Sequence, residues 1–162
     1  AGMELSLAKK RINRYYKAFP EALICLGNHC KLPNRKALTA GLSSRWIKTM
    51  EDILDTPNWT YGEKFTIDGL TYCHGVGGDA LSKLNKFMSS YACGHYHQKS
   101  FVHHKVDGNG DKKFALQVGC GCDEDKYAFA YGRDFGKMQI NVGVILDNGK
   151  LPFIEHYNDW VK

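Results

Sequence analysis

The stretch YACGHYH, residues 91–97, decides the fold class because an apolar run leads directly into a glycine and two histidines. Short apolar runs that stop at a glycine are typical of buried strands, and polar residues then gather where the strand ends. Two other stretches have the same order, ALICLGNH at 22–29 and TYCHG at 71–75. We expect three strands of a layered sheet, with their polar residues along one edge.

Helical segments are expected before and between these strands, because apolar residues recur at helical spacing over residues 4–18, 44–54 and 78–90. Asp79 stands at the start of the third segment, where a carboxylate can accept hydrogen bonds from unpaired backbone N–H groups. Asp68-Gly69 predicts a tight hairpin turn. The remaining strands are expected near 100–106, 113–118, 139–146 and 150–154. The predicted fold class is therefore α/β, of a layered α+β kind.

The composition is that of an ordinary globular chain. With 162 residues, of which 43% are hydrophobic, we expect a single domain over 1–162, and Ala1-Gly2 ahead of Met3 reads as the remnant of a tag. No apolar run approaches the roughly 18–20 residues of a membrane span. No basic end followed by an apolar block marks a signal peptide. We therefore expect a cytoplasmic protein without a membrane partner.

The net charge indicates the kind of partner, and the cysteines indicate their redox state and whether a structural zinc site is expected. A net charge of +5 favours an anionic partner. Basic residues follow the first histidine closely: Lys31, Arg35, Lys36, Arg45 and Lys48. Short apolar runs contain Cys25, Cys73 and Cys93, where a thiol packs as a small hydrophobic group, and we expect the cysteines to be reduced. Cys120 and Cys122 have no second cysteine pair at zinc-finger spacing, which disfavours a structural zinc site.

Four of the seven histidines follow an apolar run beside a glycine: His29, His74, His95 and His97. If residues 95–97 are extended, His95 and His97 point to one side with Cα atoms about 6.6–7 Å apart. That separation suits two metal ions about 3.5–4 Å apart better than one ion. Gly94 is expected to let the backbone turn closely around the site. His103 and His104 are adjacent on an expected strand, and we predict a structural or solvated role for both.

The motifs GNH (27–29), HG (74–75) and GHYH (94–97) resemble, in this order, those of the calcineurin-like metallophosphoesterases. The similarity is to a phage and prophage-type branch and covers about residues 4–155, including KAFPEALICLGNH, GLSSRWIK, TYCHGVGG and VGCGCDEDKYAFAYGRDF. The resemblance implies that Asn28, His74 and His95 bind one divalent metal and that His97 binds a second. It also implies that His29 is catalytic and assists the leaving oxygen. Mn²⁺ is expected ahead of Fe, Zn and Ni, and a phage origin would place the protein in the bacterial host cytoplasm.

The chain departs from the family at its N-terminal side, because the aspartate motifs that should precede GNH are absent. The acidic residues before Gly27 are Glu4 and Glu21, and neither stands in such a motif. Two ions held close together repel each other unless a carboxylate lies between them. We therefore expect one metal position to be well occupied. Asp79 and the acidic run 123–125 are the local substitutes, although a helix cap and a solvated loop are the favoured roles.

The resemblance thus implies an incomplete calcineurin-like phosphoesterase sandwich, equivalent to the C-terminal part of that domain. The first functional hypothesis is a metal-dependent phosphoesterase, or the histidine-bearing part of a split or truncated one, which hydrolyses phosphodiesters or phosphomonoesters, nucleic acid included. The alternative is a catalytically inactive remnant that acts as a nucleic-acid-binding or assembly module. Absent strands would leave open sheet edges, so we expect a homo-oligomer or a complementing chain.

Overall fold

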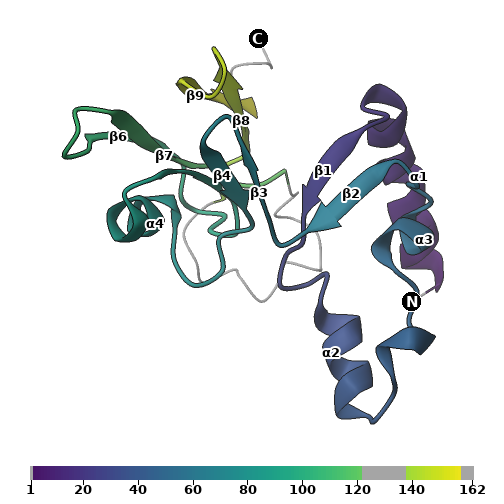
Figure 1. Ribbon diagram of the computed structural model, residues 1–162. Coiled ribbons are helices and arrows are strands. Elements are labelled where there is room, and N and C mark those ends of the chain that lie inside the picture. The colour runs from purple at the N-terminus through teal and green to yellow at the C-terminus, as the bar shows by residue number, and fades with distance from the viewer. Residues whose placement is uncertain (1, 122–137, 158–162) are drawn as a thin grey trace. The chain divides into compact units, whose positions relative to one another are not determined.

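The computed structural model describes residues 2–121 and 138–157, and the chain divides into two compact units, 1–63 and 64–162 (Figure 1). We call them the N-terminal unit and the C-terminal unit. Both combine helices with strands, so the α+β class is confirmed. The expectation of a single domain stays a prediction. Among the described helices, none combines the length and the apolar character that crossing a membrane requires.

The N-terminal unit is built around two parallel strands, β1 and β2, with Ala22 opposite Trp59. Its elements in chain order are α1 (Gly2–Ala18), β1 (Ala22–Cys25), α2 (Leu32–Thr39), the 3-10 helix η1 (Ser44–Trp46), α3 (Met50–Leu54) and β2 (Trp59–Gly62). The buried indole of Trp59 donates a hydrogen bond to the Phe19 carbonyl and meets the ring of Tyr16 edge to face. Trp59 therefore fastens the end of α1 to the sheet.

Two predictions for the N-terminal unit are wrong. The helix expected over 44–54 is broken into η1 and α3, because Ser43 and Thr49 each cap a new start and Ile47 between them is extended. Trp46, expected on the apolar side of that helix, is 85% exposed. Strand β1 is shorter than the apolar run, and Leu23 is 48% exposed, so the strand is not covered on both faces.

The C-terminal unit holds a five-stranded sheet with the order β3-β4-β5-β7-β6. The strands are β3 (Lys64–Ile67), β4 (Leu70–Cys73), β5 (Ser90–Cys93), β6 (Phe101–Val106) and β7 (Lys112–Gln117). Strands β4, β5 and β7 run parallel, and β3 and β6 run antiparallel to their neighbours. The predicted hairpin is confirmed, since Asp68 and Gly69 both have positive φ between β3 and β4.

One face of this sheet packs against helix α4 (Ala80–Phe87), and the other packs against the hairpin of β8 (Asn141–Leu146) and β9 (Leu151–His156) (Figure 1). On the helix side, Leu84 and Ala80 of α4 pack against Cys93 and Ala115. On the hairpin side, a second core forms around Leu70, Phe114 and Leu116, with Ile145 and Ile154 over it. The sheet is thereby covered on both faces.

The predicted cap of α4 is confirmed. The Asp79 carboxylate accepts hydrogen bonds from the backbone N–H and the hydroxyl of Ser82, and it pairs with the Lys99 ammonium at 2.6 Å. The Lys99 contact first, and the Ser82 bonds next, lower the pKa of Asp79 from 3.8 to about 2. Asp79 thus starts the helix and also reaches the loop that follows β5.

We predict that Asp79→Ala lowers the free energy of unfolding by about 1–2 kcal/mol at neutral pH, through the lost cap and ion pair. Because the folded-state pKa is depressed, this contribution is present above pH 3.8 and is lost as the pH falls toward about 2. Urea unfolding of the wild type and the variant at pH 7 and pH 2 measures it. Asp111→Ala, which removes a largely exposed carboxylate, is the control. A difference of equal size at both pH values would contradict the prediction.

Candidate metal centre

The imidazoles of His74 and His95 lie against each other at one edge of the five-stranded sheet. His74 follows β4 and His95 follows β5, and these neighbouring strands run parallel with Cys73 opposite Cys93. Their carboxyl ends therefore meet at the same edge. His95 Nδ1 lies 3.1 Å from His74 Nε2, and the rings meet edge to face. Two of the predicted site residues are thus brought into direct contact.

The close approach of the two loops depends on Gly75. Its φ is +102°, and a Cβ atom there would lie 2.8 Å from the Gly94 carbonyl oxygen. A side chain at residue 75 would therefore push the loop after β4 away from the loop after β5. The sequence pattern predicts this need at Gly94, where an added Cβ would meet only ordinary contacts. That expectation is wrong, because the residue that must lack a side chain is in the loop after β4 and not in the loop after β5.

The segment 95–97 is not extended, so the condition under which His95 and His97 were expected to point to one side is not met. His95 has a φ of +75°, in the left-handed region, and the chain then turns as the Lys99 N–H donates to the Tyr96 carbonyl. A non-glycine residue held at positive φ costs on the order of 1 kcal/mol, and such residues occur often at functional sites. The strained backbone of His95 carries its ring toward His74.

The distance between the two ring nitrogens is in the range that a shared divalent ion requires. Two nitrogen ligands at about 2.1 Å from one ion lie about 3.0–3.4 Å apart at the usual ligand angles. The observed separation of 3.1 Å allows the pair either to share a proton or to exchange that proton for a metal ion. Over residues 2–121 and 138–157, no group of three or more His, Cys, Asp and Glu side chains is placed to hold a metal. A metal ion bound by this pair would therefore need a further ligand.

Gln117, at the end of β7, holds the backbone beneath the histidines. The side chain is fully buried, its Oε1 accepts from the Ala80 N–H, and its Nε2 donates to the carbonyls of Gly94 and Val118. One amide therefore joins the start of α4 to the residue before His95. Gln117 is not among the residues predicted from the sequence. Its place directly after the apolar residues FAL would have indicated a buried polar group that needs hydrogen-bond partners.

Four further contacts fix the rest of the loop that carries His97. The His97 carbonyl accepts a hydrogen bond from the Gln139 N–H, and Ser100 Oγ accepts one from Asn141 Nδ2. Lys99 pairs with Asp79 and lies over the ring of Tyr96, with its Nζ 4.9 Å from the ring centre. Together with the hydrogen bond from Gln117 of β7, these contacts connect the loop to β7, to the start of α4 and to the start of β8. They restrict the positions available to the histidine rings.

Asn28 and His29 lie in the N-terminal unit, in the turn between β1 and α2. The turn is closed by the Leu32 N–H, which donates to the His29 carbonyl. Gly27 is buried, Asn28 is half-buried and His29 is exposed. Their position at a strand end agrees with the sequence analysis, but β1 belongs to a separate sheet from β4 and β5. The acidic run 123–125 lies outside the described residues.

A pair of thiols lies directly before the two histidines. The Cys73 and Cys93 sulfur atoms are 3.4 Å apart on neighbouring strands. The hydrogen bond from the Cys93 thiol lowers the pKa of Cys73 from 9.0 to about 6, against the opposing effect of burial. The same contact, together with burial, raises the pKa of Cys93. Both cysteines were predicted to pack as small hydrophobic residues, and their contact was not predicted.

We predict that Gln117→Leu lowers the free energy of unfolding by about 3 kcal/mol, because buried groups of Ala80, Gly94 and Val118 would lose their partner. Chemical denaturation of the wild type and the variant measures the change. Gln98→Leu, at an exposed position of the same loop, is the control and should stay within about 0.5 kcal/mol of the wild type. Equal effects at residues 98 and 117 would contradict the role given to this amide.

Comparison with known proteins yields no relative: no family model, no curated protein and no solved structure matches this chain significantly. The function is accordingly inferred from the chain's own residues and their geometry.

Proposed function

We propose that this chain is a metal-dependent phosphoesterase, or the histidine-bearing part of one, with its ion held by His74 and His95. The observation that carries the proposal is the contact of the two imidazoles at the ends of parallel strands, with ring nitrogens 3.1 Å apart. In α/β proteins, ligands bind at the carboxyl ends of parallel strands. The order of the GNH, HG and GHYH motifs supports a calcineurin-like arrangement in particular.

The histidines of the C-terminal unit have different roles in this proposal. His74 and His95 bind the ion through the two facing nitrogens. His97 provides for a second, weaker position, since no bridging carboxylate is found beside the pair among the described residues. The roles that the resemblance implies for Asn28 and His29 stay predictions. A bound divalent ion, with Mn²⁺ expected ahead of Fe, Zn and Ni, would supply Lewis-acid stabilisation of the phosphoryl oxygens.

The protein's own contribution is to hold these ligands still. The amide of Gln117, the Asp79–Lys99 pair and the close approach at Gly75 fix the two loops before any ligand arrives. Ligands that are held in place by hydrogen bonds around them bind metal more tightly and direct substrate more accurately. The rigid loops therefore favour a site that is formed in advance.

We predict that the chain hydrolyses an aryl phosphodiester when Mn²⁺ is added, and that His95→Ala reduces this activity to the background rate. His103→Ala, an exposed histidine on β6, is the matched control and should retain activity. The rate of aryl phenolate release and the Mn²⁺ bound after gel filtration are measured for all three proteins. Equal loss in both variants would contradict the proposal. So would a wild-type chain that neither binds Mn²⁺ nor shows Mn²⁺-dependent turnover.

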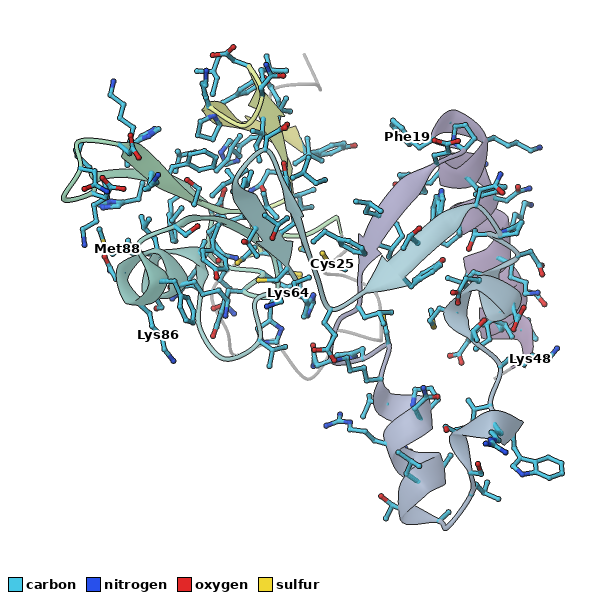
Figure 2. The ribbon with its side chains drawn as sticks, viewed as in Figure 1. Phe19, Cys25, Lys48, Lys64, Lys86 and Met88 are labelled. Atoms are coloured by element: carbon cyan, nitrogen blue, oxygen red, sulfur yellow. The ribbon has the colours of Figure 1, made fainter. Side chains whose placement is uncertain are left out.

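A second candidate function, binding of single-stranded nucleic acid, has an observation of its own. Trp46 is 85% exposed, and Arg45 and Lys48 are exposed on either side of it. Figure 2 shows Lys48 pointing outward from its segment. An exposed indole among basic residues can stack on a base while the cations hold the phosphates.

We predict that Trp46→Ala weakens binding of a short single-stranded DNA by about tenfold or more, since one stacked base is lost. Hydrolysis of the small aryl phosphodiester should be unchanged. Fluorescence anisotropy at several salt concentrations measures the affinity, and it should fall as salt rises. Tyr15→Ala, which removes an aromatic ring that is 61% exposed on α1, is the control. Equal weakening in both variants would contradict a specific role for Trp46.

A further inference from the structure

We infer that Cys73 and Cys93 form a reversible dithiol–disulfide pair, a covalent modification site that takes a small-molecule disulfide as its oxidant. The inference rests on the placement of the two sulfur atoms in the sheet. It does not depend on the proposed metal centre or on phosphoester hydrolysis.

The register of β4 and β5 places the two cysteines directly opposite each other. Neighbouring strands lie about 4.8 Å apart, within the Cα separation of about 4.4–6.8 Å that disulfides require. The sulfur atoms are already 3.4 Å apart, and both side chains pack on the α4 side of the sheet. Rotation of the side chains, without movement of the strands, can therefore bring the sulfurs to the bonding distance of about 2.05 Å.

The two thiols differ in access to solvent, which assigns their order of reaction. Cys93 is 2% exposed and lies in the core with Ala80, Leu84 and Ala115. Cys73 is half-buried at the margin of the same core. A reagent from solvent therefore reaches Cys73 first, and Cys93 is placed to react only with the sulfur atom that faces it.

The reaction balances with glutathione disulfide as the oxidant. The Cys73 thiolate attacks one sulfur of that disulfide, so that a Cys73–glutathione bond forms, the original S–S bond breaks and one glutathione thiolate leaves. Cys93 then attacks the Cys73 sulfur, a Cys73–Cys93 bond forms and the second glutathione leaves. The protein gives up two electrons, and its two thiol protons pass to the released thiolates. Excess reduced glutathione reverses both steps.

The test is equilibration of the full chain with defined ratios of reduced and oxidised glutathione, followed by acid quenching, alkylation and peptide mass spectrometry. We expect a Cys73–Cys93 linked peptide that appears in one transition and disappears with dithiothreitol. The exposed Cys30 is the control position, and Cys30→Ser should leave the transition unchanged. Circular dichroism verifies that each variant is folded.

Two variants separate the roles of the thiols. Cys93→Ala should trap glutathione on Cys73 as a stable mixed disulfide, and Cys73→Ala should leave the buried Cys93 unmodified. The wild-type measurement remains decisive if either variant fails to fold. A persistent glutathione adduct on Cys73 of the wild type, a link from Cys73 to another cysteine, or two unreacted thiols at the most oxidising ratio would each overturn the inference.

Discussion

The parallel pairing of β4 with β5 is the constraint on which the rest of the candidate site depends. Because Leu70 lies opposite Ser90 and Cys73 lies opposite Cys93, the residues that follow both strands must emerge side by side. A shift of the register by one residue would turn the thiols to opposite faces and separate the imidazoles. The histidine contact and the thiol contact thus share one cause.

Three residues outside β4 and β5 fix the loops that follow these two strands. The absence of a side chain at Gly75 lets the two loops approach, and the strained φ of His95 turns its ring toward His74. The amide of Gln117 then joins the Gly94 carbonyl to the start of α4. Since each of these groups acts on backbone atoms, the site is determined more by main-chain placement than by side-chain packing.

Local patterns in the sequence predicted most of the elements of the C-terminal unit. Asp68-Gly69 identified a hairpin and Asp79 identified a helix start, because both depend on interactions within a few residues. The same reasoning failed over 44–54, where Ser43 and Thr49 offered competing helix starts inside an apolar pattern. Periodicity alone could not choose between one helix and two short ones.

The contacts of the candidate site were less predictable, since they depend on which strands pair and in which register. The clustering of histidines beside glycines pointed to His74 and His95, but it could not reveal the turn at His95 or the buried role of Gln117. It also placed β1 in the same sheet as β4, whereas β1 pairs with β2. The expectation of an oligomer or a complementing chain along the open edges stays a prediction.

The central claim is that the two facing imidazole nitrogens exchange their shared proton for a divalent ion. The most direct measurement is a Zn²⁺ titration of the ¹⁵N-labelled chain, with Zn²⁺ as a diamagnetic probe of the site and the imidazole nitrogen shifts as the readout. The account predicts that His74 Nε2 and His95 Nδ1 move together to metal-bound shifts at one equivalent, while the exposed His103 and His104 do not. Shifts confined to His103 and His104, or a His74–His95 hydrogen bond that persists at saturating Zn²⁺, would contradict it.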